Sequence, residues 1–121
     1  MTVTIYHNPS CSNSRGALAI LRERGIEPKI VAYLRTPPTA DELAALAAQL
    51  KASAGAAWPG LAEGMLRAKE AIWTALRLDG ADDAALLAAA VAHPILLNRP
   101  IVVTAKGARL CRPPEKVLEI L

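Results

Sequence analysis

The segment Thr4 to Arg15 constrains the fold of this chain more than any other stretch. Its first residues are β-branched or aromatic, as in a short strand over residues 3–6, and Pro9 then breaks the chain in a tight turn. Cys11 stands directly before residues 12–24, where apolar positions recur at helical spacing. The sequence therefore predicts a strand, a tight turn and a helix, with a cysteine at the helix start.

At 121 residues the chain is long enough to bury one core, and we expect residues 1–121 to form a single domain. Hydrophobic residues make up 53% and aromatic residues only 3%, so the core must consist mainly of aliphatic side chains. The net charge of +3 comes from scattered basic residues. Because a nucleic-acid groove needs a concentrated basic stripe, usually with stacking aromatic residues, we expect no nucleic-acid partner.

The two cysteines, Cys11 and Cys111, are too few for a disulfide framework and form no CxxC pair, so no metal is expected. Residues 1–5 have the pattern of a strand rather than of a signal peptide, and no apolar run reaches membrane-spanning length. These features favour a cytoplasmic protein without a membrane partner. In that reducing compartment cysteines are more often catalytic than structural.

The middle of the chain predicts a second strand over residues 29–34 and, after Pro37 and Pro38, a helix. Thr39 and Glu42 have the spacing of a capping box, which marks the start of that helix. Its expected apolar face consists of Leu43, Leu46, Ala47 and Leu50.

Residues 51–64 are rich in Ala and Gly and predict an irregular connection. Helical patterns return over 66–76, with Ile72, Trp73 and Leu76 on one side, and over 84–92, which Pro94 ends. We expect these segments to form a helical insertion over about residues 52–92.

The last third of the chain predicts a hairpin of two short strands, 101–104 and 109–111, joined at Lys106 and Gly107. A helix that starts with Pro113-Pro114-Glu115 follows. Its expected apolar side consists of Val117, Leu118, Ile120 and Leu121. The order of elements predicts a thioredoxin-like α/β fold, with three α/β/α layers, a mixed four-stranded sheet and the helical insertion.

Cys11 is the first candidate for chemistry. Free cysteines are often small buried hydrophobes, but the polar neighbours of Cys11 make a poor core environment. A helix N-terminus lowers a cysteine pKa from roughly 8.5 to between about 3.5 and 7.5, which favours a reactive thiolate. Because Ser14 stands where a CxxC protein has its second cysteine, the second sulfur must come from Cys111 or from outside the chain.

Cys111, His7 and Ser14 each have two interpretations, one structural and one functional. Cys111, between Leu110 and Arg112, is better suited to packing than to catalysis. His7 either assists the thiolate or caps the turn, and Ser14 either points its hydroxyl at the sulfur or caps the helix.

Arg99 and Pro100 stand directly before the predicted third strand. In thioredoxin-like folds a cis-proline commonly lies there beside the active cysteine. We therefore expect Pro100 to bring Arg99 next to Cys11, the alternative being a surface arginine in a turn. Arg112, at the end of the next strand, is expected to face the same site. Arginine is suited to bidentate recognition of an oxyanion.

Several segments together resemble the glutaredoxin-coupled arsenate reductases of the ArsC family, in the right order over nearly the whole chain. These segments are His7-Asn8-Pro9-x-Cys11-x-x-Ser14-Arg15, Tyr33-Leu34, Pro37-Pro38, Leu66-Arg67-x-Lys69, His93-Pro94-Ile95-Leu96-x-Asn98-Arg99-Pro100-Ile101-Val102 and Arg109-Leu110-Cys111-Arg112-Pro113.

The resemblance implies a thioredoxin-like enzyme that reduces arsenate to arsenite with glutathione and glutaredoxin, and that holds no bound cofactor. It implies that Cys11 is the nucleophile that attacks arsenate, and that Arg67, Arg99 and Arg112 bind the oxyanion. It further implies a covalent Cys11–arsenic adduct. Glutathione then reacts with that adduct, and glutaredoxin resolves the resulting mixed disulfide.

Two alternatives remain open at the level of sequence. A Spx-like transcriptional regulator shares the fold, but it binds RNA polymerase and usually senses redox state with CxxC, whereas this chain has Ser14. A glutathione-dependent thiol reductase that acts on another substrate fits the sequence equally well.

Overall fold

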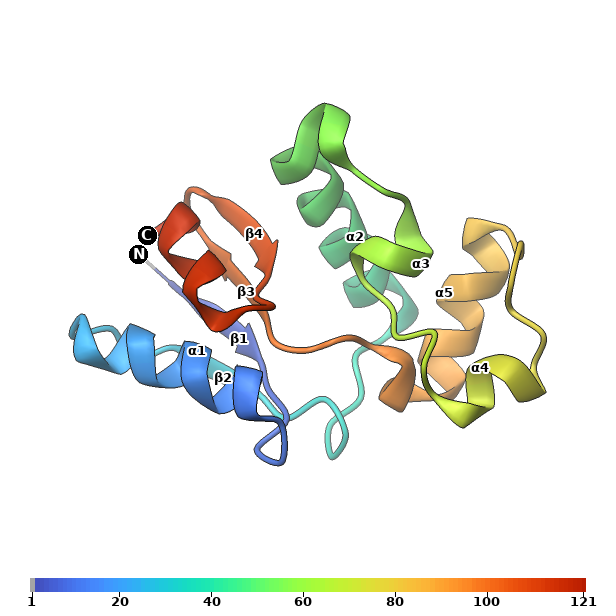
Figure 1. Cartoon of the computed structure of the whole chain (residues 1–121), viewed down its shortest axis with the longest axis horizontal. Helices are drawn as coiled ribbons and strands as arrows, with labels where there is room; N and C mark the ends of the chain where they lie inside the picture. The colour runs from blue at the N-terminus through green and yellow to red at the C-terminus, as the bar shows by residue number, and fades with distance from the viewer. Residues whose placement is uncertain (1) are drawn as a thin grey trace. The chain divides into compact units, whose positions relative to one another are not determined.

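The computed structural model describes residues 2–121, which form short strands and helices toward both ends of the chain and helices alone between them (Figure 1). Met1, where the predicted first strand and domain begin, lies outside the described residues. The chain forms two units: its two ends, up to Thr36 and from Arg99, make one, and Pro37–Asn98 makes the other. The elements are, in order, β1 (Thr4–Tyr6), α1 (Ser12–Glu23), β2 (Lys29–Val31), α2 (Ala40–Ala54), η1 (Gly55–Ala57), α3 (Leu61–Gly64), α4 (Ala71–Ala75), α5 (Asp83–Ala92), η2 (Pro94–Leu96), β3 (Ile101–Thr104), β4 (Gly107–Leu110) and η3 (Pro114–Ile120), where η denotes a 3₁₀ helix.

The first unit contains a mixed four-stranded sheet in the order β2-β1-β3-β4. β1 pairs with β2 in parallel, with Ile5 opposite Ile30, because α1 carries the chain back between the two strands. On its other side β1 pairs antiparallel with β3, with Ile5 opposite Val102, and β3 forms a hairpin with β4. The predicted mixed sheet and order of elements are confirmed.

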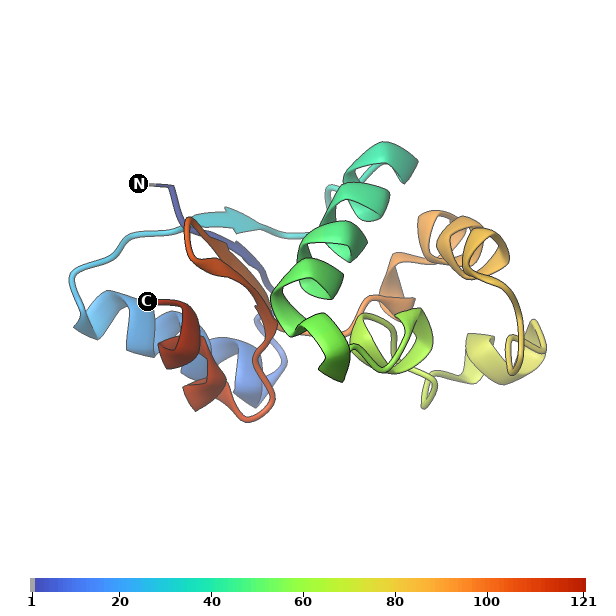
Figure 2. The same cartoon turned by 90° about the horizontal axis from the view of Figure 1, so that it is seen from above.

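The core of this unit lies between the sheet and two helices, α1 and η3, which cover the same face of the sheet (Figure 2). α1 passes close to the start of η3. The closeness is seen at Gly16, where an added Cβ atom would lie only 2.8 Å from Pro114 Cγ. The buried residues of this core are Val3, Ile5, Ala17, Leu18, Leu21, Val102, Cys111, Val117 and Ile120.

The C-terminal helix differs from its prediction in one respect. It is a 3₁₀ helix, in which residues three apart lie on the same side. Val117 and Ile120 are therefore buried together, whereas Leu118, expected on the apolar side, is 43% exposed.

The second unit is helical. The capping box that opens α2 is confirmed, since the Glu42 N–H donates to Thr39 Oγ1 at 3.2 Å and the Thr39 N–H donates to Glu42 Oε1 at 3.1 Å. The predicted apolar face of α2 buries Leu43, Leu46 and Leu50. The helices of the predicted insertion, about residues 52–92, belong to this unit, and the single domain over residues 1–121 stays a prediction.

Two predicted elements are longer than the observed ones. The strand predicted over 29–34 ends at Val31, because the N–H groups of Arg35 and Thr36 both donate to the Ala32 carbonyl, at 2.9 and 2.8 Å, and close a turn. The helix predicted over 66–76 is reduced to α4.

The shortening at residues 66–76 has a tertiary cause. Leu66 forms an isolated antiparallel bridge with Leu97, and the Arg67 N–H donates to the Leu96 carbonyl at 2.8 Å. Backbone groups bonded in this way are not available to a helix.

The irregular connection predicted over residues 51–64 is wrong in large part. α2 continues to Ala54, because Lys51–Ala54 contains no residue that breaks a helix, and it stops where Gly55 adopts a positive φ of 57°. η1 and α3 then follow within the same segment. Across residues 2–121 we find no helix that combines the length and the apolar character needed to cross a membrane.

Candidate active site

The turn between β1 and α1 is fixed by its own polar groups. Asn8 Oδ1 accepts a hydrogen bond from the Ser10 N–H at 2.9 Å, and the Asn8 carbonyl accepts one from the Cys11 N–H at 3.0 Å. Arg15 Nη1 donates to the Pro9 carbonyl at 2.8 Å. Cys11 is thereby held at the N-cap of α1 with an extended backbone, φ −94° and ψ 124°.

His7 and Ser14 lie buried behind this turn. His7 Nδ1 and Ser14 Oγ are hydrogen-bonded at 2.6 Å, and the Asn8 N–H donates to Ser14 Oγ at 3.0 Å. Burial lowers the pKa of His7, and the positive charges of Arg22 and Arg15 lower it further. The Ser14 hydroxyl is therefore engaged with His7 and with the Asn8 backbone. Through these hydrogen bonds, His7 and Ser14 help to hold the turn that carries Cys11.

Cys11 is half-buried, and its thiol has a lowered pKa. Desolvation by burial raises the pKa of Cys11, but four contacts outweigh it: the Ser14 backbone, the Arg99 side chain, the Asn13 backbone and the Arg112 side chain. The backbone groups belong to the first turn of α1, where N–H groups and the helix dipole favour an anion. These groups therefore shift Cys11 toward the thiolate relative to an ordinary cysteine.

The two arginines reach the sulfur from the opposite end of the chain. Arg112 Nη1 donates to Cys11 Sγ at 3.6 Å and to the Arg99 carbonyl at 3.0 Å. The Arg99–Pro100 peptide bond is cis, as predicted. The structure thus brings Cys11, Arg99 and Arg112 together, and the surface-turn interpretation of Arg99 is not needed.

Cys111 has the opposite environment. Its side chain is fully buried in the core of the first unit, and burial raises the pKa of the Cys111 thiol to about 12. A thiol of this kind is neither ionised nor accessible near neutral pH, so the packing interpretation of Cys111 is supported.

Arg67 belongs to the second unit, where its Nε lies 3.1 Å from Glu70 Oε1 in an ion pair. The pair holds the guanidinium in a partly buried position, with 23% of the side chain exposed. The role of Arg67 in oxyanion binding stays a prediction.

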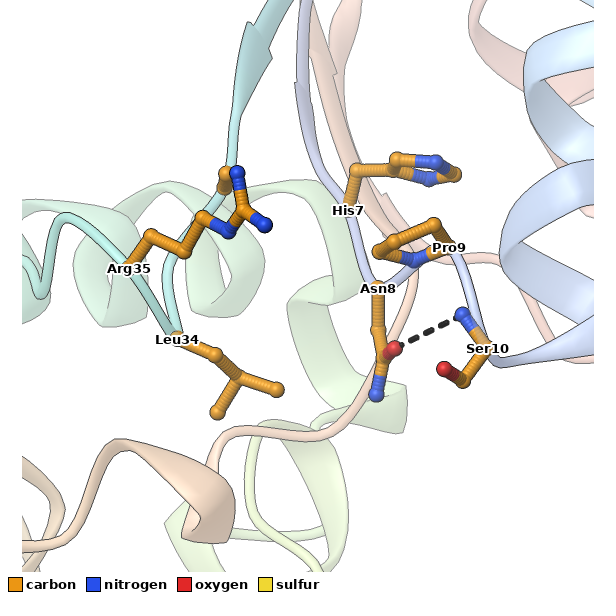
Figure 3. Close-up of a pocket in the computed structure, with 7 residues that line it drawn as sticks. His7, Asn8, Pro9, Ser10, Leu34 and Arg35 are labelled. Carbon is orange, nitrogen blue, oxygen red and sulfur yellow. Dashed lines mark hydrogen bonds between the residues drawn. The ribbon is translucent and has the colours of Figure 1, made fainter.

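A hollow of about 360 Å³ adjoins the same turn (Figure 3). Figure 3 shows Asn8, Pro9 and Ser10 on one side of it and Leu34 and Arg35, from the turn after β2, on the other. The residues that line it are His7, Asn8, Pro9, Ser10, Ala32, Leu34 and Arg35.

Three contributions to this region were missed in the sequence. Asn8 could have been identified, because an Asn two residues before Ser10 is typical of a turn closed by its own side chain. The contact of Arg15 with Pro9 and the position of Arg35 depend on packing and have no local signal. In residues 2–121, no three His, Cys, Asp or Glu side chains form a group that could hold a metal ion.

Comparison with known proteins gives consistent results. The model of the ArsC family matches residues 6–120. The chain is 48% identical to a protein named arsenate reductase from Escherichia coli strain K12, over 98% of this chain and 80% of that protein. It is 43% identical to the uncharacterized protein YfgD of the same strain, over 98% of this chain and 96% of that protein.

Among solved structures, an arsenate reductase from Vibrio cholerae superposes with a TM-score of 0.90 at 46% identity, covering 100% of this chain and 98% of that one. This likeness confirms the predicted thioredoxin-like fold class. Because the family model and these relatives extend over nearly the whole chain, the protein belongs to the ArsC family.

Proposed function

We propose that this protein is an arsenate reductase that uses glutathione and glutaredoxin as its reductants. The observation that carries the proposal is the environment of Cys11, a half-exposed thiol with a lowered pKa and two guanidinium groups at its sulfur. A nucleophile surrounded by cations suits a substrate that is itself an anion. The names of the relatives support arsenate as that anion.

Arsenate is a tetrahedral anion, and planar guanidinium groups bind such oxygens with two parallel hydrogen bonds. Arg99 and Arg112 already point at the sulfur, so an anion that approaches Cys11 meets both. The resemblance to the family adds Arg67 as a third ligand. These cations also stabilise the negative charge that develops on the oxygens during attack.

The reaction we propose begins when the Cys11 thiolate attacks arsenic. An S–As bond forms, and one arsenate oxygen leaves as water after protonation. A glutathione thiolate then attacks Cys11 Sγ, and the electron pair of the S–As bond stays on arsenic. As(V) is thereby reduced to As(III), which leaves as arsenite, while the two sulfurs are oxidised to a Cys11–glutathione disulfide. A glutaredoxin thiolate attacks the glutathione sulfur and releases the Cys11 thiolate.

The need for an external thiol follows from the two cysteines of the chain. Cys111 is buried, with a pKa of about 12, and is a poor source of a thiolate at neutral pH. Ser14 stands in place of a second cysteine in the turn. An enzyme that depends on reduced thiols in this way suits the cytoplasm, where we place it.

The test is an arsenate-dependent NADPH-consumption assay, coupled through glutathione, glutaredoxin and glutathione reductase. We expect wild type to consume NADPH and Cys11→Ser to lose all arsenate-dependent turnover, because the serine hydroxyl is not ionised at neutral pH. Cys111→Ala, which keeps a small apolar side chain in the core, is the matched control and keeps most of the activity.

Arsenate reduction by Cys11→Ser would contradict the proposed nucleophile. A flat trace from wild type, with active glutaredoxin present, would instead favour a thiol reductase of another substrate or a Spx-like regulator.

A further inference from the structure

The hollow beside the active-site turn is not used by the arsenate chemistry. Its lining includes Ser10, the residue directly before Cys11 in the turn, while Cys11 itself is not among the lining residues. Its volume of about 360 Å³ falls within the range of small-molecule sites, which hold roughly 300–1,000 Å³. A second ligand in this hollow would therefore lie against the turn that carries Cys11.

The lining of the hollow differs from that of an oxyanion site. Pro9, Ala32 and Leu34 supply apolar surface, and Leu34 is 43% exposed. Arg35 is the one lining arginine, whereas two guanidinium groups converge on Cys11. A tetrahedral anion binds best where several donors converge, so the hollow suits a longer molecule with an apolar stem and a separate anionic end.

Arg35 is available to such a molecule. Its side chain is exposed and, within residues 2–121, makes no hydrogen bond or ion pair. Across the hollow, Asn8 uses its Oδ1 to accept the Ser10 N–H, which leaves the amide NH₂ group as a donor. Figure 3 shows the Asn8 side chain and Leu34 facing each other across the hollow. One cation and one amide donor thus flank an apolar wall.

We propose that this hollow binds glutathione, with a carboxylate of the tripeptide on Arg35 and its thiol directed to Cys11. The inference rests on the proposed use of glutathione and adds where the tripeptide binds. Glutathione carries two carboxylates and one ammonium group, so its net negative charge complements Arg35. An extended tripeptide spans roughly 10 Å, so its thiol can extend well beyond the side chain that anchors its carboxylate.

The test follows thiol–disulfide exchange at Cys11 without arsenate. The Cys11 thiolate attacks oxidised glutathione, a Cys11–glutathione disulfide forms, and one glutathione thiolate leaves. The rate is measured by the mass increase of the protein and compared with the rate for 2-hydroxyethyl disulfide, which has no carboxylate. All variants are made in a Cys111→Ala background so that a single thiol reacts.

We expect Arg35→Ala to slow the reaction with oxidised glutathione by roughly three- to tenfold, the effect of losing one exposed charge-assisted hydrogen bond. Its rate with 2-hydroxyethyl disulfide stays within about twofold of the parent. Arg24→Ala removes another exposed positive charge after the C-terminal end of α1 and is the matched control, with both rates unchanged. If Arg35→Ala changed the rates with the two disulfides equally, or changed neither rate, the proposed glutathione site would be wrong.

A second measurement separates this site from the proposed function. In the coupled arsenate assay, Arg35→Ala is expected to raise the KM for glutathione and to leave the KM for arsenate unchanged. A raised KM for arsenate alone would overturn the site. If wild type reduces no arsenate, the proposed function fails, and the disulfide rates still decide whether Arg35 binds glutathione.

Discussion

Groups of two different kinds lower the pKa of Cys11. The backbone of Ser14 and Asn13 acts from the first turn of α1, and the guanidinium groups of Arg99 and Arg112 act from the C-terminal part of the chain. The first kind is fixed by local structure, because Cys11 is the N-cap residue. The second kind exists only when the sheet is formed, and it can be removed by substitution without disturbing the helix.

Arg99→Ala and Arg112→Ala should therefore each raise the pKa of Cys11. A guanidinium group that donates to the sulfur stabilises the thiolate, and its loss favours the thiol. The measurement is the pH dependence of alkylation by iodoacetamide, whose midpoint we expect to move upward in each variant.

Arg24→Ala, far from the sulfur along α1, serves as the control and should keep the wild-type midpoint. Unchanged midpoints in both test variants would show that neither guanidinium contacts the thiolate in solution.

For individual residues around Cys11, the sequence predicted which residues matter better than it predicted the contacts between them. Cys11 and Arg99 could be identified, since each stands at a recognisable point, a helix start or an X–Pro step before a strand. The hydrogen bond of Ser14 with His7 could not be predicted, because it depends on how the end of β1 packs against α1. Arg35 was missed since its importance depends on the hollow beside it.

Among the elements, the packing of α1 against η3 explains a residue that helix propensity disfavours. Gly16 lies inside α1, where glycine costs about 1 kcal/mol relative to alanine. A Cβ atom there would lie 2.8 Å from Pro114 Cγ and 3.1 Å from Pro114 Cβ. Because the proline ring cannot rotate away, close packing of the two helices requires glycine.

We expect Gly16→Ala to destabilise the protein by about 1 kcal/mol. Overpacking costs typically 1–3 kcal/mol, and the gain in helix propensity offsets about 1 kcal/mol of that cost. Urea unfolding followed by circular dichroism measures the change.

Ala19→Gly, at an exposed position of the same helix, is the control, because it loses about 1 kcal/mol through propensity alone. A Gly16→Ala protein more stable than wild type would mean that η3 moves aside at little cost.

Elements with strong local signals were predicted correctly, and those defined by tertiary contacts were not. The capping box at Thr39 fixed the start of α2, and Asp82, which accepts from the Ala85 N–H at 2.8 Å, caps α5. The helical pattern after Leu66 was overridden by its bridge to Leu97. Apolar periodicity alone does not reveal such a bridge, since its partner lies about thirty residues further along the chain.

For the whole molecule, sheet order explains how distant residues meet. Arg112 and Cys11 are 101 positions apart, yet β1 lies directly beside β3, and β3 beside β4. The turn after β1 and the segment after β4 consequently come to the same region of the first unit. Any condition that loosens this sheet should therefore reduce stability and the accessibility of the thiolate form together.

Acid should destabilise the protein partly through His7. Its pKa is lowered in the folded state, by burial first and then by Arg22 and Arg15, from an ordinary value of 6.5. The unfolded chain therefore takes up a proton at a higher pH than the folded one. The contribution of His7 to stability is complete above pH 6.5 and is lost as the pH falls through the lower, folded-state pKa.

The test measures the free energy of unfolding by urea at pH 7.5 and pH 5.5 in a Cys11→Ser background, which removes the titration of the thiolate. We expect a loss of stability at pH 5.5 that is smaller in His7→Gln, because glutamine takes up no proton. His93→Gln, at the other histidine of the chain, is the matched control for a histidine-to-glutamine substitution elsewhere. An equal loss in the His7→Gln protein would show that His7 is not held neutral behind the turn.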